Sequence, residues 1–215
     1  MAALLAGAAL SLSAQPQVPR FGDLAICSLC HLRLSAPKGV ADLPERWMGP
    51  AALWPASMMA HSARDPYWRA KVHFETASTP ALAPAIEDTC LRCHAPMQQY
   101  EVRAERRPMA LQELNKTGEQ GVGCTVCHQI TSERLGGKES FEAGFVINDE
   151  RLAFGPHPNP FSHPMEMHSG YIAAEGRHVS ESALCATCHT VITPSVNAAG
   201  EMTGEFVEQA PFLEW

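Results

Sequence analysis

One pentapeptide pattern, Cys-x-x-Cys-His, occurs four times in the chain and uses all 8 of its cysteines. The four copies are Cys27–His31, Cys90–His94, Cys124–His128 and Cys185–His189. The two cysteines of each copy are three residues apart, so their sulfurs lie on one side of a helical turn. Two thiols followed directly by a histidine are the attachment pattern of c-type haem, in which the histidine is the proximal ligand of the iron.

Zinc sites and disulfide bonds are the other uses of paired cysteines. About 15–20 residues separate the two pairs of a zinc ribbon, whereas 30 residues separate Cys93 from Cys124, the closest pairs here. Neither alternative gives a reason for a histidine after every second cysteine. The pattern therefore predicts four covalent haems c with their iron. The expected attachment residues are Cys27, Cys30, Cys90, Cys93, Cys124, Cys127, Cys185 and Cys188, and the expected proximal ligands are His31, His94, His128 and His189.

The length and composition fit a chain wrapped around flat apolar groups. A chain of 215 residues makes one domain or two small ones. Its 17 prolines and 15 glycines favour loops over long regular elements, and four porphyrins can supply much of the buried interior. We therefore expect a mainly α fold with extensive loops and little or no β-structure, wrapped around four stacked haems.

The net charge of −7 argues against nucleic acid and anionic membrane surfaces as partners. The sequence contains no run of about 18 apolar residues that would span a bilayer. The expected partners are redox proteins that donate or accept electrons, and association of several copies stays open.

The first 20 residues resemble a leader and linker. An apolar stretch from Ala2 to Leu12 is followed by small residues up to Ala14, as at the end of a signal peptide, although the first basic residue is Arg20. Because haem c is attached outside the cytoplasm, we expect a periplasmic or extracellular protein. Residues 21–215 are expected to form the tetrahaem domain, and the apolar ending Phe212–Trp215 indicates that more chain follows.

Local signals predict several helices. Asp65 before Pro66 predicts a helix that runs to about Ala77. Further caps are expected for the helices or turns that carry the motifs: Asp23 for the first, Glu87 and Asp88 for the second, and Ser180 for the fourth. We also expect a polar helix over 109–116 and a turn-like chain after Pro194.

The second axial ligand of each iron separates the candidate functions. Histidines on both sides of the iron serve electron transfer, whereas an open sixth position invites catalysis. Six histidines remain after the proximal ones are assigned. The expected distal ligands are His61, His157, His168 and His178, with His73 and His163 less favoured and Met58 and Met59 as alternatives. His168 and His178 rank highest because both are expected in a non-helical approach to the fourth motif.

The four motifs, together with the segments 54–66 and 182–190, resemble multihaem c-type cytochromes. The most similar type is the periplasmic tetrahaem cytochrome that takes electrons from hydroxylamine oxidoreductase, over roughly residues 21–194. The resemblance implies a mostly helical, haem-stacked fold and an electron-shuttle role. Relatives carry a Trp-x-x-Ser-Met-His pattern whose histidine is a distal ligand. Here Met59 stands at that position, and His61 lies two residues further on.

The function expected from the sequence is electron transfer in the periplasm or outside the cell, by four covalent c-type haems with mostly bis-histidine ligation. One alternative is a multihaem oxidoreductase whose single five-coordinate haem acts on a small nitrogen or sulfur compound. Another is a subunit of a haem-stacked filament. An enzyme is the less favoured of these, because no residue set for proton delivery stands out in the sequence.

Overall fold

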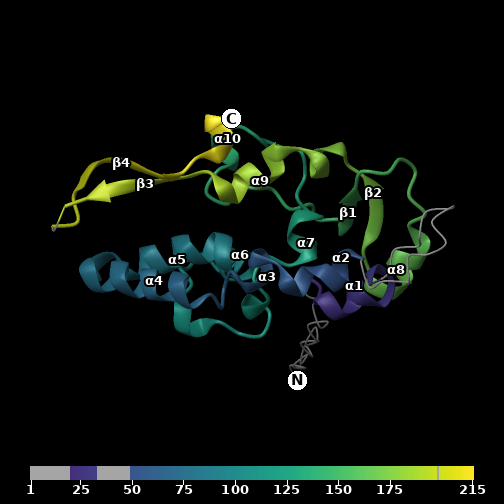
Figure 1. The fold of residues 1–215 in the computed structure, drawn as a ribbon, viewed down its shortest axis with the longest axis horizontal. Coiled ribbons are helices and arrows are strands. Elements are labelled where there is room, and N and C mark those ends of the chain that lie inside the picture. Colours follow the sequence, from purple (N-terminus) through teal and green to yellow (C-terminus); the bar gives the residue numbers. More distant parts are fainter. Residues whose placement is uncertain (1–19, 33–48, 198) are drawn as a thin grey trace, which may run out of the picture.

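The computed structural model describes residues 20–32, 49–197 and 199–215, and within them the chain forms two layers with α7 (Cys124–Cys127) between them (Figure 1). The lower layer consists of α1 (Leu24–His31), α2 (Pro50–Leu53), α3 (Met58–His61), α4 (Pro66–Ser78), α5 (Ala83–His94) and α6 (Pro96–Ala104). The upper layer consists of α9 (Ser182–His189), α10 (Pro211–Glu214), β3 (Val191–Val196) and β4 (Met202–Gln209). The leader expected over residues 1–20 lies, apart from Arg20, outside the described residues.

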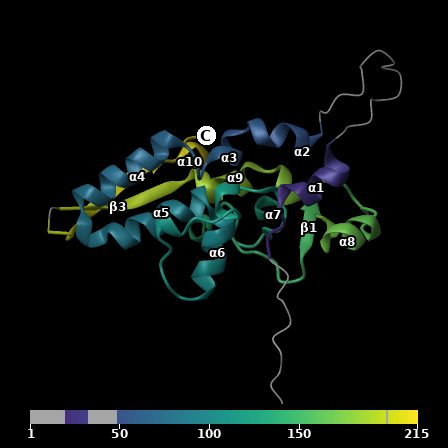
Figure 2. The same ribbon diagram turned by 90° about the horizontal axis from the view of Figure 1, so that it is seen from below.

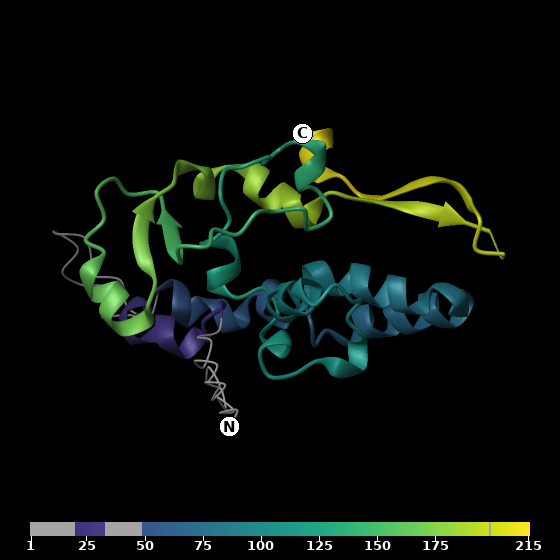
Figure 3. The same ribbon diagram turned by 180° about the vertical axis from the view of Figure 1, so that it is seen from behind.

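Two small sheets accompany the helices. β1 (Leu152–Gly155) pairs in parallel with β2 (Ile172–Glu175), and α8 (His163–Ser169) lies beside them and contacts α1 (Figure 2). β3 and β4 form an antiparallel ribbon that extends over α4 and α5 (Figures 1 and 3). Within the described residues, no helix has both the length and the apolar character needed to cross a membrane.

The mainly helical class agrees with the expectation, whereas the expected scarcity of β-structure needs correction. The chain after Pro194 is not turn-like, because Pro194 lies within β3 and pairs with Glu205 of β4. Proline is tolerated there because a two-stranded ribbon consists of edge strands only.

The local caps of the lower layer form as expected. The Asp23 carboxylate accepts a hydrogen bond from the backbone N–H of Ala25 (2.8 Å) and starts α1. The Asp65 carboxylate accepts one from the backbone N–H of Trp68 (2.7 Å), with Pro66 in the first turn of α4. This helix ends at Ser78, one residue beyond the expected end.

Two other expected caps are wrong. α5 begins at Ala83 with Pro84 in its first turn, so Glu87 and Asp88 lie inside the helix rather than at its start. At the fourth motif, Glu181 is the N-cap of α9 and makes no side-chain capping bond. Ser180 instead ends the short 3-10 helix η6 (Arg177–Ser180).

The polar helix expected over 109–116 is also wrong, because that segment forms only the 3-10 turn η3 (Leu111–Glu113). The Gln98 side chain of α6 donates to the Glu113 carbonyl (2.8 Å) and accepts from the Asn115 N–H (2.9 Å). These tertiary bonds use backbone groups that a continuing helix would pair internally.

The hydrophobic core is divided into two clusters, and cysteines of the motifs border both. One cluster contains Phe21, Met97, Val122, Val126, Ile130, Ala143, Phe145, Ile147 and Leu184, and Cys93, Cys127 and Cys188 pack against it. The other contains Ala63, Trp68, Val72, Leu91, Ala95, Val102 and Met109, and Cys90 packs against it. The fold therefore gathers cysteines of the motifs around its apolar interior.

Asp88 connects α5 to the segment after α6 although its side chain is nearly buried. Its carboxylate accepts hydrogen bonds from the Met109 N–H (2.9 Å), the Gln99 side chain (3.1 Å) and Arg92 (2.9 Å). Burial alone would raise the pKa of Asp88, but these bonds outweigh it and lower the pKa below its usual 3.8. The carboxylate is therefore ionised in the folded chain at neutral pH.

We expect Asp88→Asn to destabilise the protein by about 1.5–3 kcal/mol at pH 7, because charge-assisted hydrogen bonds are weakened. A carboxylate whose folded pKa is lowered stabilises the fold above its unfolded pKa and loses that contribution as the pH falls through its folded pKa. The difference between wild type and variant should therefore shrink below about pH 5 and vanish under the lowered pKa. Guanidinium unfolding at several pH values measures it, and a difference that does not depend on pH would contradict this account.

Candidate haem-binding sites

Each of the four motifs occupies the last turn of a helix. α1, α5 and α9 end at His31, His94 and His189, and His128 is the C-cap of α7. The helical turn brings the two cysteines of a motif to one side, and the helix end leaves the histidine ring free of a following turn. The same local geometry therefore recurs four times on four separate elements.

His94 is held by two hydrogen bonds to a single residue of the segment after α3. Its ring Nδ1 donates to the backbone carbonyl of Ser62 (3.0 Å), and its own carbonyl accepts from the Ser62 hydroxyl (2.8 Å). A carbonyl oxygen only accepts, so Nδ1 carries the ring proton and the Nε2 lone pair is free. A metal-ligating histidine has this arrangement, in which the second nitrogen is fixed by a backbone carbonyl.

His128 is held in the same way by Phe154 of β1. Its Nδ1 donates to the Phe154 carbonyl (2.6 Å), and its carbonyl accepts from the Phe154 N–H (2.7 Å). The proton is again fixed on Nδ1, which leaves Nε2 available to a metal. Two separate motifs therefore present their histidines as the proximal role requires.

Trp68 of α4 supports His94 from the side. The two rings are stacked with centroids 4.3 Å apart and an interplanar angle of 8°. Burial lowers the pKa of His94 and outweighs the opposing hydrogen bond to Ser62. The imidazole is therefore neutral at pH 7, which is the form that binds iron.

An apolar pocket of about 300 Å³ lies at the fourth motif. Cys185 and His189 line it from α9, while Phe212 and Trp215 line it from the C-terminal segment. Aromatic walls beside a thiol and an imidazole suit one face of a porphyrin. The residues at this motif thus fit a covalent haem.

Thiols of different motifs touch one another. Cys27 lies beside Cys124, and Cys93 lies beside Cys188. The first contact raises the pKa of Cys27, and the second raises that of Cys188 well above its usual value. Burial is the largest cause that raises the pKa values of the Cys90 and Cys127 thiols to about 11, and nearby charge, from Glu208 at Cys90 and from Cys185 at Cys127, adds to it. Each of the four motifs thus has a thiol near a thiol of another motif.

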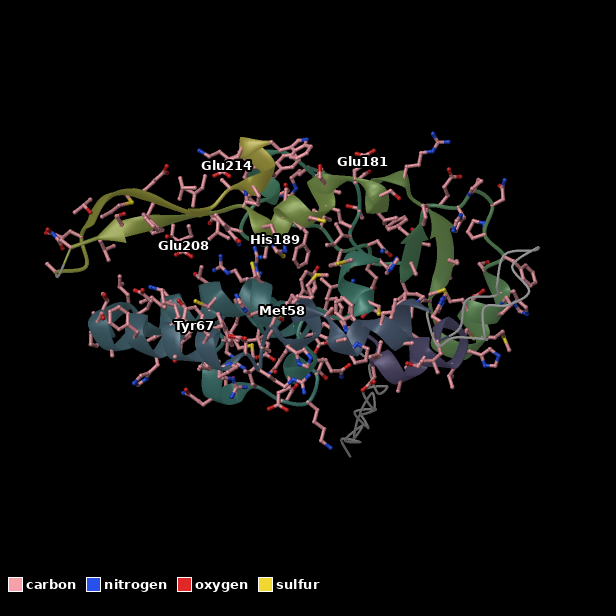
Figure 4. The ribbon with its side chains drawn as sticks, viewed as in Figure 1. Met58, Tyr67, Glu181, His189, Glu208 and Glu214 are labelled. Carbon is pink, nitrogen blue, oxygen red and sulfur yellow. The ribbon has the colours of Figure 1, made fainter. Side chains whose placement is uncertain are left out.

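The second and fourth motifs face each other across the two layers. His189 influences the pKa of His94, and Glu208 of β4 influences that of Cys90. Figure 4 shows His189 and Glu208 in the upper layer facing the lower layer, which carries Met58 and Tyr67. The β3–β4 ribbon therefore lies over the second motif.

The expected distal histidines differ in their surroundings. His178 is half-buried in η6 near the third motif, with its ring edge-to-face against Phe154 and its Nε2 donating to the Ile130 carbonyl (2.8 Å). Its free lone pair is therefore on Nδ1. His61 donates from Nε2 to the Pro55 carbonyl (2.8 Å) and accepts from Arg64 at Nδ1 (3.3 Å), so both of its ring nitrogens are engaged.

The other candidates lie on the surface. His157, His163, His168 and His73 are all exposed. His168 belongs to the helix α8, which contacts α1, and not to a non-helical approach to the fourth motif as expected. Pro164 is in the first turn of this helix, where proline is tolerated, so the prolines of this segment do not prevent it. α8 thus brings His163 and His168 into the neighbourhood of the first motif.

The geometry does not favour the alternative uses of the cysteines. Every cysteine is free in the structure. Over residues 20–32, 49–197 and 199–215, no three histidine, cysteine or acidic side chains gather closely enough to hold a metal ion between them. A zinc ribbon would bring two cysteine pairs onto one metal, whereas a haem needs one pair and one histidine from a single turn.

The family model described as cytochrome c554 and c-prime matches residues 26–129. The match supports a c-type cytochrome. It spans the first three Cys-x-x-Cys-His motifs and ends before the fourth, which lies at 185–189. A c-type cytochrome carries covalent haem c with its iron and serves electron transport. No curated protein and no solved structure matches this chain.

Sequence reasoning missed the residues that orient the proximal histidines. Ser62 and Phe154 act through backbone carbonyls, which every residue type carries, so no sequence signal marks them. Trp68 stacks on His94, a contact between two helices that no local sequence pattern marks.

Proposed function

We propose that this chain is an exported tetrahaem electron carrier. Each of its four motifs holds one covalent haem through two thioether bonds and one proximal histidine. The observation that carries the proposal is that each motif lies next to another motif through its side chains. The four motifs thereby form one series of neighbours in the order second, fourth, third, first.

Three pairwise proximities support this order. Cys93 of the second motif touches Cys188 of the fourth. Cys127 of the third packs against the same core cluster as Cys188, and Cys185 and Cys188 both interact with it electrostatically. Cys124 of the third motif touches Cys27 of the first. The chain's part is to hold its redox groups in sequence and to shield them from water.

Each bound haem supplies one-electron redox chemistry at its iron. The chain's own residues fix the reactive nitrogen of His94 and His128 through the Ser62 and Phe154 carbonyls. Backbone carbonyl acceptors increase the basicity of the imidazole and fix the orientation of the ring. Export is part of the proposal because the thioether bonds form outside the cytoplasm.

The first test uses the protein matured in a host that exports and attaches haem c. Its intact mass is expected to exceed that of the bare polypeptide by four haems. Reductive titration is expected to take four electrons per chain, because each motif holds one iron. The oxidised protein should show low-spin spectra with no shift on addition of cyanide, and the reduced protein should show no shift on addition of carbon monoxide.

Other results would point to the rival functions. A high-spin signal with ligand-induced shifts would favour an enzyme with an open iron, and fibres in negative stain would favour a haem-stacked filament. Mature protein without a Soret band would contradict all three.

A further inference from the structure

A second pocket lies on the outer side of α5, away from the attachment cysteines. It has a volume of about 300 Å³ and is formed by α5, α6 and the segment that follows α6. Its α5 residues recur at three- and four-residue spacing, from Ala85 through Asp88 and Thr89 to Arg92. Cys90 and His94 project from the opposite side of the same helix. The haem expected at the second motif and this pocket are thus on different faces.

Four arginines line this pocket, which we call the arginine pocket: Arg92, Arg103, Arg106 and Arg107. They are four of only 16 basic side chains in a chain whose net charge is −7. The positive charge of these four side chains is opposite in sign to the net charge of the chain. Only one carboxylate, that of Asp88, belongs to the lining.

The internal ion pairs leave donors free in the pocket. Arg92 uses Nε and Nη2 on a single Asp88 oxygen, at 3.3 and 2.9 Å. Arg107 uses Nε on Glu105 and Nη1 on Glu113, each at 2.8 Å. Each guanidinium therefore keeps at least one nitrogen with unused donors.

Arg103 and Arg106 have no carboxylate partner among the described residues. Arg106 also has a φ of 58°, a left-handed conformation that is uncommon outside glycine. The chain thus adopts an unfavourable backbone conformation at the residue that adds the second unpaired cationic group to the pocket wall. Even after Glu105 and Glu113 are counted, the arginine pocket keeps an excess of positive charge.

The support beneath Arg92 is fixed. Asp88 is only 8% exposed and is bound by the Met109 N–H and Gln99, so Arg92 is held against a buried anchor. Guanidinium groups fixed around a small concave site match the oxygens of phosphate and carboxylate groups in pairs. A pocket of this size takes a small ligand or a single charged group of a larger one.

We propose that the arginine pocket binds a multivalent oxyanion, of the phosphate or polycarboxylate kind. The ion is either free in solution or is presented by an acidic segment of a partner protein. This proposal does not depend on the electron-transfer function.

The test uses the haem-loaded protein and calorimetric titration at low ionic strength. The probes are inorganic phosphate, citrate and a hexaglutamate peptide, each repeated in sodium chloride of matched ionic strength. The variant Arg103→Gln/Arg106→Gln removes both unpaired cations. Its control is Arg134→Gln/Arg177→Gln, which makes the same charge change at exposed arginines outside the pocket.

We expect phosphate or citrate to bind at about one site per chain in the wild type and in the control. The pocket variant should bind at least about tenfold more weakly, because several charge-assisted bonds are lost. Circular dichroism and haem content should be equal in all three proteins. Hexaglutamate that binds and is displaced by phosphate identifies a partner's carboxylates as the source, whereas binding of the small ions alone identifies a free ion.

Two results would overturn the proposal. One is equal affinity in the pocket variant and the control, which would mean a general charge effect. The other is a haem-loaded wild type that binds none of the three probes, as it would if a group of the protein itself filled the pocket.

Discussion

Replacing Trp68 by alanine is expected to lower the free energy of unfolding by about 3–5 kcal/mol. The indole is 9% exposed, belongs to the second core cluster with Val72 and Leu91, and stacks on the His94 ring at 4.3 Å. Truncation to alanine leaves a cavity between α4 and α5 and removes a wall of the imidazole. The imidazole should also lose its stacking partner, while its hydrogen bond to the Ser62 carbonyl remains.

Guanidinium unfolding of the haem-loaded protein measures the change in stability, and its visible spectrum reports on the iron ligated by His94. Trp68→Phe is the matched control, because it keeps a flat ring and should cost less than about 1.5 kcal/mol. An alanine variant as stable as the phenylalanine variant would show that the indole contributes no packing of its own.

The sequence was sufficient wherever one short segment determines the structure. The helices α1 and α4 follow from Asp23 and from Asp65 with Pro66, because a cap and its helix are neighbours in the chain. The motifs are equally local, since the geometry of two thiols and one imidazole is set within a single turn. Their assignment to haem therefore needed no tertiary information.

Predictions failed where contacts with another segment of the chain determine the local structure. Asp88 was expected to cap the turn of the second motif, yet it lies inside α5 and is used in tertiary bonds to Met109 and Gln99. The side chain of Gln98 takes the backbone partners that a helix over 109–116 would need. Each of these contacts joins residues far apart in the chain, and the residue types involved are common.

The candidate distal histidines could be predicted only in part from the sequence. Sequence reasoning predicts which four histidines are proximal, but it has no means to find the spatial neighbours of the other six. The structure brings His178 to the third motif through Ile130 and Phe154, while both ring nitrogens of His61 are engaged by Pro55 and Arg64. Which of the remaining histidines approaches which motif depends on the fold rather than on spacing.

Replacing both Cys90 and Cys93 by alanine is expected to remove one haem in four and leave the other three attached. Attachment depends on the local pentapeptide, so the first, third and fourth motifs keep their own thiols and histidines. The haem-to-protein ratio should fall from about four to about three, measured by intact mass and by the pyridine haemochrome spectrum. Thr89→Ala, a change just before the motif on the same helix, is the control and should keep all four.

Removing different motifs tests the proposed order of neighbouring motifs, which is second, fourth, third, first. The second motif is at one end of the series, where Cys93 meets Cys188, so its removal leaves three neighbouring sites. The third motif joins the first to the fourth through Cys124 and Cys127, so Cys124→Ala/Cys127→Ala should isolate the first site. After a flash of photochemical reductant, absorbance should settle in one fast phase in the second-site variant and in two separated phases in the third-site variant. The reverse pattern would mean that the motifs are connected in a different order.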